Sequence, residues 1–149
     1  MSGKTGRQKP APSAKALEDA RNLFNYGLPL LLGVRVLEVN AERVTAELPV
    51  KKEHFNRNGR VGGGVLMAMA DAMGAAGSVV HRPAGHRGGT LESKTNFFAA
   101  GRGPVLRGVC VPLHIGRTTS VWQTTLTDAD GRMVAMVVQT QMSLPSEGD

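Results

Sequence analysis

One acidic residue, Asp71, interrupts an apolar run that covers residues 65–80. No Lys or Arg lies between Arg60 and Arg82, so no neighbour on the same helix can form an ion pair with this carboxylate. Burial of an unpaired charge costs several kcal/mol, and carboxylates in such surroundings occur at catalytic sites as well as in structural networks. Asp71 is therefore a candidate catalytic residue. The alternative is that its face of the helix opens to solvent or to a second chain.

Three consecutive glycines, Gly62, Gly63 and Gly64, stand directly before this run. At the start of a helix, glycines allow a ligand to approach free N–H groups, and the helix dipole favours negative charge there. An oxyanion that develops at a reacting carbonyl requires such surroundings. The alternative is a flexible entry into the helix. A nucleotide-binding loop is excluded, because the spacing fits neither G-x-G-x-x-G nor a loop that ends in Gly-Lys-Ser/Thr.

The two candidate groups are separated along the chain. Asp71 follows Gly63 by eight residues, which corresponds to about 12 Å along an α-helix. That distance is too long for both groups to touch the same carbonyl. If both are catalytic, they must come from different subunits, so the pattern predicts at least a homodimer with shared sites.

The periodicity of the chain predicts one short helix, two strands, one long helix and four strands. Residues 14–26 have the spacing of an amphipathic helix, which Gly27 and Pro29 end. Residues 65–80 are apolar on every side except at Asp71, which indicates a helix buried all round. Alternating patterns between turn signals predict strands at residues 34–39, 44–50, 90–98, 105–115, 118–127 and 133–144.

These elements must cover the long helix. Short connections make consecutive strands neighbours, and a curved antiparallel sheet can surround one buried helix. Pro112 cannot donate a hydrogen bond to a neighbouring strand, so it predicts a bulge or an edge position. The sequence therefore predicts an α+β fold with a long central helix wrapped by such a sheet.

Composition narrows the range of functions. The chain of 149 residues suits one domain, predicted for residues 14–149 behind a disordered basic tail, residues 1–13. Its formal charge is +6, but four basic residues precede Glu18, and 14 basic and 12 acidic residues remain without them. A nearly neutral domain argues against a nucleic-acid partner.

The remaining composition signals point to the cytoplasm. The single Cys110 excludes an internal disulfide and fits a reducing compartment. The tail lacks the apolar segment of a secretory signal, and the run at residues 65–80 is interpreted as too short to span a membrane. His54, His81 and His86 lack metal-ligand spacing, so no metal and no cofactor are expected.

A longer pattern combines these features with later segments. It comprises His54-x-Asn56-x-x-Gly59-x-x-Gly62-Gly63-Gly64, then Asp71, then Lys94-Thr95-Asn96-Phe97-Phe98, and His114-x-Gly116-Arg117-Thr118. From about residue 33 to residue 144, the chain resembles the hotdog-fold acyl-CoA thioesterases of the PaaI-like (phenylacetate degradation) group, within the 4-hydroxybenzoyl-CoA thioesterase-like superfamily. The resemblance implies the hotdog fold, hydrolysis of an acyl-CoA to free acid and CoA, and a homodimer, with two dimers joined into a tetramer. It departs from the family pattern at Gly62, where the family has a second His.

The resemblance also implies roles for single residues. The backbone N–H of Gly63, with Asn56 beside it, would polarise the thioester carbonyl, and Asp71 of the partner subunit would act as nucleophile or general base. Thr90 stands where the family often has a hydroxyl that orients water. The residues along the CoA arm would be Phe97 and the turn of His114, Gly116, Arg117 and Thr118, with Arg117 near a phosphate.

Two other functions remain open at this level. The substitution at Gly62 favours a non-catalytic acyl-CoA binding or sensing protein on the same fold. A DNA-binding sensor would need an added recognition module, for which the first ~30 residues are too short. A hydratase would need a catalytic His, and only His54 is near. The pattern fits either an aromatic or a medium-length aliphatic acyl group.

Overall fold

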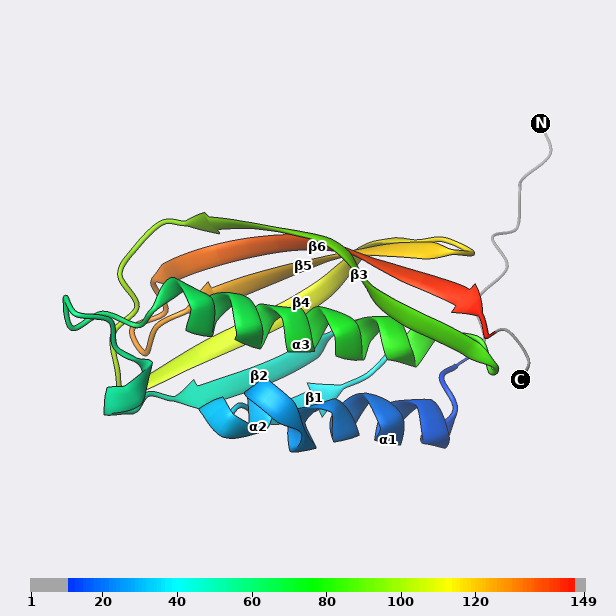
Figure 1. The fold of residues 1–149 in the computed structure, drawn as a ribbon, viewed down its shortest axis with the longest axis horizontal. Coiled ribbons are helices and arrows are strands. Elements are labelled where there is room, and N and C mark those ends of the chain that lie inside the picture. Colours follow the sequence, from blue (N-terminus) through cyan, green and yellow to red (C-terminus); the bar gives the residue numbers. More distant parts are fainter. Residues whose placement is uncertain (1–10, 147–149) are drawn as a thin grey trace.

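A six-stranded antiparallel sheet curves around one long helix, α3 (Gly63–His81), in this computed structural model, which describes residues 11–146 (Figure 1). The first ten residues of the predicted basic tail lie outside the described residues. The order of the strands is β1-β2-β4-β5-β6-β3. The strands are β1 (Arg35–Val39), β2 (Val44–Pro49), β3 (His86–Phe97), β4 (Val105–Ile115), β5 (Thr119–Thr127) and β6 (Met133–Pro145). The predicted α+β class with a sheet-wrapped central helix is confirmed.

Small and flexible side chains let α3 lie close to the sheet. Met69 and Met73 are fully buried, and thioether chains of this kind fill irregular gaps in a core. Gly77 lies so near the indole ring of Trp122 that a Cβ atom there would come within 2.5 Å of the ring. The Ala- and Gly-rich composition of the run is thus what allows the helix to approach β4, β5 and β6.

One face of α3 is not covered in the single chain. Gly64, Met67 and Asp71, which follow each other at helical spacing, are exposed. The prediction of a helix buried all round is wrong for this face, because these three residues stay exposed although the sheet, α1 and α2 pack against the helix (Figure 1). The structure therefore agrees with the stated alternative, a face that opens to solvent or to a second chain. Apolar composition cannot distinguish a side chain that faces its own core from one that faces a partner.

The N-terminal helical segment has three parts rather than one. They are α1 (Ala14–Asn22), the 3₁₀ turn η1 (Leu23–Asn25) and α2 (Gly27–Leu32). The Oγ of Ser13 caps α1 by accepting the N–H of Ala16 at 3.1 Å. The helical stretch predicted for residues 14–26 does end before Gly27, at Asn25, but the prediction missed the second helix, α2, which begins at Gly27. Pro29 lies in the first turn of α2, where its missing N–H would have no partner anyway, and Gly33 ends α2 in the left-handed conformation, with φ 80°.

The edge strand β3 pairs with β6, although β4 follows it in the chain. Consecutive strands are neighbours for β1 and β2 and for β4, β5 and β6, but the expected pairing of β3 with β4 is wrong. Residues 98–104 return the chain to β4 beside β2. There the N–H of Val50 donates to the carbonyl of Pro104 at 2.8 Å, and the N–H of Val61 to that of Gly101 at 3.2 Å. These hydrogen bonds fix the start of β4 next to β2.

Two bulges interrupt the sheet. The register of β4 and β5 shifts between Pro112 and His114, which confirms the bulge predicted from Pro112. The register of β3 and β6 shifts between Thr90 and Glu92, so Leu91 is an extra residue in β3. No sequence signal marks this second bulge. β3 also begins at His86, four residues before the predicted strand.

The length of α3 bears on the expectation about membranes. With 19 residues, α3 is long and apolar enough to cross a membrane by length and composition alone, so the argument that the run is too short is wrong. The helix instead packs against β2, β3, β4, β5 and β6 and against α1. It is the core helix of this fold.

Candidate functional site

A chain of hydrogen bonds connects Asp71 to the core of the sheet. The hydroxyl of Thr90 on β3 donates to Oδ1 of Asp71 at 2.9 Å. The Nε2 group of Gln141 on β6 donates to the same hydroxyl oxygen at 2.8 Å. Gln141 is almost fully buried, whereas Thr90 and Asp71 are exposed in the single chain. The carboxylate predicted from the sequence is therefore held on the open face of α3 by a buried amide that acts through a hydroxyl.

The bulge at Leu91 explains why Thr90 faces α3. Side chains alternate between the two faces of a strand, so residues seven positions apart, such as Thr90 and Phe97, normally point in opposite directions. The extra residue cancels one step of this alternation. Thr90 pairs across the sheet with the buried Gln141, and Phe97 pairs with the buried Ala135, so both side chains face the helix.

A second buried glutamine, Gln139, holds the backbone of α3 at the same place. Its Nε2 group donates to the carbonyl oxygen of Asp71 at 3.3 Å, and its side chain lies directly against Gly74. Among the described residues, Oε1 of Gln139 has no hydrogen-bond partner. Sequence reasoning missed both glutamines. The sequence contained a signal for them, because residues 137, 139 and 141 lie on one face of β6 and two of the three are polar.

The other candidate group, Gly63, is the first residue of α3. Gly62 precedes it as the N-cap and donates its N–H to the carbonyl of His54 at 2.8 Å. The N–H of the first helical residue has no acceptor within the helix, so that of Gly63 is free to bind a ligand. A Cβ on Gly63 would lie 3.1 Å from Cζ of Phe97. The structure thus brings Gly63 and Phe97 together within one chain.

Asn56 lies in the loop that leads to this helix end. Its Oδ1 accepts hydrogen bonds from the N–H groups of Asn58 at 2.9 Å and Arg60 at 3.3 Å, so this oxygen stabilises the loop. Only its Nδ2 group is left to donate to a ligand. Asn56 also borders a pocket of about 430 Å³, whose lining residues are Leu28, Leu32, Glu53, His54, Phe55, Asn56, Gly62, Gly64 and Val65.

A smaller apolar pocket of about 210 Å³ contains Asp71. It lies between α3 and the N-terminal segment, and its other lining residues are Leu23, Leu28, Pro29, Ala68, Ala72 and Ala75. Leu28 of α2 lines both this pocket and the pocket beside Asn56. The open face of α3 is therefore bordered by two apolar pockets that share one residue.

The turn between β4 and β5 lies at the opposite end of α3 from Gly63. The N–H of Gly116 donates to the carbonyl of Thr119 at 2.8 Å, and the carbonyl of Thr118 accepts the N–H of Ser143 at 2.7 Å. Gly116 and Arg117 line a pocket of about 220 Å³ together with Arg82 at the end of the helix. His114 is exposed on the strand before the turn. Within one chain, the structure does not bring this turn together with Gly63 or Phe97.

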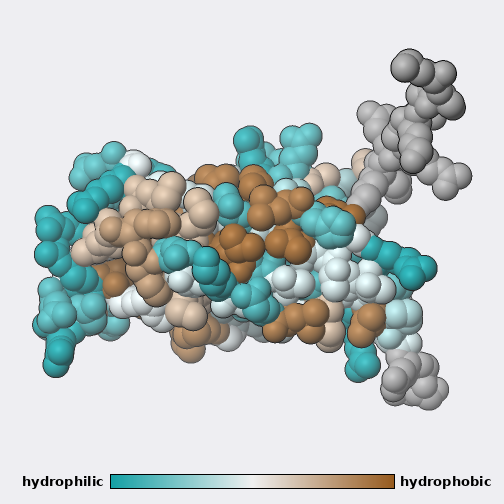
Figure 2. Space-filling view, turned by 90° about the horizontal axis from the view of Figure 1, so that it is seen from above, coloured by the Kyte–Doolittle hydropathy of each residue, from teal (hydrophilic) through white to brown (hydrophobic). Residues whose placement is uncertain are grey.

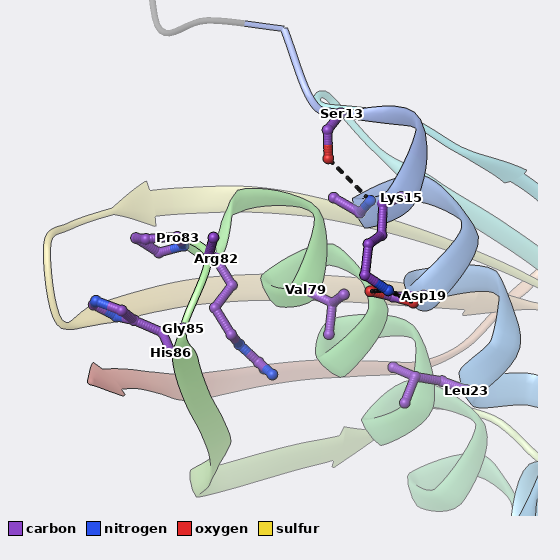
Figure 3. Close-up of a pocket in the computed structure, with 11 residues that line it drawn as sticks. Ser13, Lys15, Asp19, Leu23, Val79, Arg82, Pro83, Gly85 and His86 are labelled. Atoms are coloured by element: carbon purple, nitrogen blue, oxygen red, sulfur yellow. Dashed lines mark hydrogen bonds and ion pairs between the residues drawn. The ribbon is translucent and has the colours of Figure 1, made fainter. Parts of the chain in front are cut away.

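A further pocket, of about 460 Å³, lies between α1 and the C-terminal end of α3 (Figure 3). Lys15 and Asp19 form an ion pair at its rim, and Arg82 extends from the helix end. Burial lowers the pKa of the Arg82 guanidinium. This pocket contains none of the predicted site residues. In the part of the chain that the structure describes, no three His, Cys, Asp or Glu side chains gather where they could hold a metal ion.

Known proteins are similar to this chain in sequence and in fold. The model of the Thioesterase superfamily matches residues 58–135. The chain is similar to the proofreading thioesterase EntH of Cronobacter turicensis, with 32% identity over 102 residues, which cover 68% of this chain and 74% of that protein. It is 28% identical to the 1,4-dihydroxy-2-naphthoyl-CoA hydrolase of Escherichia coli over 102 residues, 68% of this chain and 75% of that one.

A solved structure extends the likeness over nearly the whole chain. The crystal structure of a mutant of thioesterase PA1618 from Pseudomonas aeruginosa superposes with a TM-score of 0.80 and 26% sequence identity. The superposition covers 94% of this chain and 98% of that one. The likeness therefore includes the sheet, the central helix and the N-terminal helical segment.

Proposed function

This chain belongs to the thioesterase superfamily and is a thioester hydrolase with the hotdog fold, and from this premise we propose that it hydrolyses an acyl-CoA thioester to free acid and CoA at a site shared between two subunits. The observation that carries the proposal is the carboxylate of Asp71, held by Thr90 on the uncovered face of α3. The name of the similar 1,4-dihydroxy-2-naphthoyl-CoA hydrolase supports a CoA thioester as the substrate class.

The proposed chemistry uses two groups. Asp71 acts as a general base that takes a proton from water, and the water oxygen attacks the thioester carbonyl. Alternatively its own oxygen attacks, and water then hydrolyses the mixed anhydride. In both routes the N–H of Gly63 stabilises the oxyanion, the C–S bond breaks, and the sulfur of CoA leaves as a thiolate that takes up a proton.

The spacing of these groups supports a two-fold arrangement. Gly63 and Asp71 each lie four residues from Met67, which is 42% exposed at the centre of the open face of α3. If the α3 helices of two subunits run antiparallel and meet at Met67, then Gly63 of one subunit lies opposite Asp71 of the other. A dimer built in this way contains two equivalent sites, each composed of one residue from each chain.

The edge strand supports the same dimer. β3 is 12 residues long and has a free edge, and such an edge is a ready site for pairing with another chain. Leu91, Phe97 and Phe98 are more than half exposed along it. Figure 2 shows hydrophobic surface in the middle of this side of the molecule, with hydrophilic side chains around it. We propose that two β3 strands meet in the homodimer and that two dimers form a tetramer.

The same arrangement supports positions for the two parts of the substrate. The apolar pockets on either side of Leu28 border both Asp71 and the helix start, and the proposal assigns the acyl group to them. Asn56 borders the carbonyl, and Phe97 and the turn of His114, Gly116, Arg117 and Thr118 bind the CoA arm, with Arg117 near a phosphate. The proposed location of the enzyme is the cytoplasm.

Mixed dimers test the shared site. One subunit carries Asp71→Asn and the other Gly63→Val, with different affinity tags so that the mixed dimer can be purified. If the site is shared, one of its two sites combines the intact Asp71 with the intact Gly63, and the mixed dimer has about half of the wild-type rate of thiol release. If each site uses one chain only, every site is defective and the mixed dimer is as inactive as either parent.

The parent dimers are the controls. Each must be inactive with a panel of acyl-CoA substrates while it remains folded by circular dichroism. Binding of CoA by the wild-type protein without thiol release from any acyl-CoA would contradict the hydrolysis and favour the binding or sensing protein that Gly62 suggested.

A further inference from the structure

We propose that Gln141 is a positioning residue for the hydrolysis: it orients the hydroxyl of Thr90 so that Thr90 donates to Oδ1 of Asp71 and leaves Oδ2 as the reacting oxygen. This inference rests on the proposed function of Asp71. It adds a residue that touches neither the substrate nor the carboxylate, and it changes the role expected for Thr90.

The number of hydrogens fixes the direction of the chain of hydrogen bonds. An amide nitrogen only donates, and an ionised carboxylate only accepts, whereas the hydroxyl of Thr90 has one hydrogen to give. With Nε2 of Gln141 at 2.8 Å and Oδ1 of Asp71 at 2.9 Å, the hydroxyl must accept from the amide and donate to the acid. The opposite orientation of the Gln141 amide would leave two acceptors competing for one hydrogen.

Burial keeps this direction fixed. Gln141 is 1% exposed and lies opposite Thr90 in the register of β6 and β3, so the amide is held by the sheet. A buried amide that loses its partner is costly, and the amide therefore enforces the hydroxyl orientation. Since Gln141 lies beneath the site and Asp71 at its surface, the amide acts on the reaction only through Thr90.

The consequence concerns the attacking water. The only hydrogen of the Thr90 hydroxyl is used by Oδ1, so Thr90 cannot also donate to a water molecule. Its role is to hold the carboxylate with one oxygen, Oδ1, occupied, which leaves Oδ2 for the reaction. The family resemblance suggested that this hydroxyl orients the water itself. The hydrogen-bond pattern adds orientation of the acid, and it leaves the second lone pair of the hydroxyl oxygen as the only site through which Thr90 can contact a water, as an acceptor.

A double-mutant cycle tests the proposal. Thr90→Val removes the hydrogen bond to the charged carboxylate and is expected to lower kcat about 10- to 100-fold. Gln141→Leu removes the hydrogen bond that orients this hydroxyl and is expected to lower kcat by no more than Thr90→Val, and both variants should change KM little. Because Gln141 acts through Thr90, the double variant is expected to have the kcat of Thr90→Val alone. A purely structural role of Gln141 would make the two losses multiply, and that result would overturn the proposal.

Two further variants keep the test decisive. Gln141→Met, which has an unbranched side chain of similar length, replaces Gln141→Leu in the cycle if the leucine variant fails to fold. Thr90→Ser retains the hydroxyl and is expected to restore most of kcat in the presence of Gln141 but not with Gln141→Leu. A full kcat in either Gln141 variant would also overturn the proposal.

Asp71→Asn separates this inference from the proposed function. If Asp71→Asn retains wild-type thiol release, the assignment of the acid fails, and the role of Gln141 fails with it. If Asp71→Asn is inactive but the cycle shows independent effects of Thr90 and Gln141, only the positioning role of Gln141 is wrong.

Discussion

Gly74 of α3 lies directly on the side-chain amide of Gln139 from β6, so close that a Cβ on Gly74 would overlap the amide. The same amide donates to the carbonyl oxygen of Asp71, three residues earlier on the helix. Because Gly74 has no side chain, α3 can approach β6 this closely beside the candidate acid.

Replacement of this glycine is expected to destabilise the protein. In Gly74→Ala the added methyl group must displace the buried Gln139 or the helix, and such overpacking costs about 1–3 kcal/mol. Gly64→Ala is the comparison on the same helix, because a Cβ there would meet no atom within 4 Å in the single chain, although this face is proposed to meet the partner subunit. Urea denaturation should show a lower midpoint for Gly74→Ala than for Gly64→Ala.

The acid itself is tested by Asp71→Asn. The amide retains an oxygen that can accept the Thr90 hydroxyl, so the variant is expected to fold and dimerise as the wild type does. Loss of the base or nucleophile is expected to lower kcat about 10²–10⁴-fold. Thiol release from acyl-CoA measures the loss, and Asp19→Asn, an exposed acid on α1, is the control that should keep full activity. Residual activity above one tenth of the wild-type value would contradict the assignment.

The contact between Gly63 and Phe97 predicts a steric effect at the start of α3. In Gly63→Ala the methyl group would lie 3.1 Å from the ring of Phe97, so the ring or the first turn must move. We expect at least a tenfold loss in kcat/KM, equivalent to about 1.4 kcal/mol. Gly62→Ala is the neighbouring comparison, since its Cβ would be 3.6 Å from the nearest atom. Because Gly62 also lines the pocket assigned to the acyl group, its loss in kcat/KM is expected to be smaller than that of Gly63→Ala, though not absent. Equal losses in the two variants would show that the contact with Phe97 is unimportant.

The proposed two-fold contact at Met67 can be tested by cross-linking. Met67→Cys places a thiol at the centre of the open face, and a short bismaleimide is expected to join two chains into a covalent dimer on a denaturing gel. Leu37→Cys is the matched control, because Leu37 is exposed on the opposite edge strand, β1. Cross-linking of Leu37→Cys alone would place the interface at the other edge of the sheet.

The natural thiol, Cys110, does not disturb that experiment. Burial raises the pKa of Cys110 to about 12, so the thiol stays protonated at pH 8, and the thiolate is the form that reacts. We expect the native protein to be inert to Ellman's reagent at pH 8 and to show one reactive thiol per chain in guanidinium chloride. Rapid labelling of the native protein would mean that the core around β4 opens to solvent.

The main features of the fold followed from local patterns, and the remaining ones depended on contacts between distant segments. The apolar run around Asp71 and the Pro112 bulge could be predicted because each pattern lies within one element. The pairing of β3 with β6 could not, because short-range rules favour the next strand in the chain. Likewise α2 was missed because Pro29 resembles a helix terminator although it occupies a first turn.

The site was predicted to a similar extent. The unusual surroundings of Asp71 and the glycines before the helix identified both candidate groups. The buried Gln139 and Gln141 were overlooked, because their alternation with Val137 was interpreted as an ordinary strand. Their roles depend on which strand lies opposite Thr90, and that register is a property of the folded sheet.

The extra residue at Leu91 has a consequence for how this site can change over time. The alternation of inward and outward side chains shifts by one residue at Leu91. A point substitution therefore cannot change which positions of β3 face α3. Deletion of one residue there would turn the Thr90 hydroxyl to the outer surface, and Phe97 would keep its direction. A change of chain length at Leu91 would therefore alter the hydroxyl beside the acid without altering Phe97 at the start of the helix.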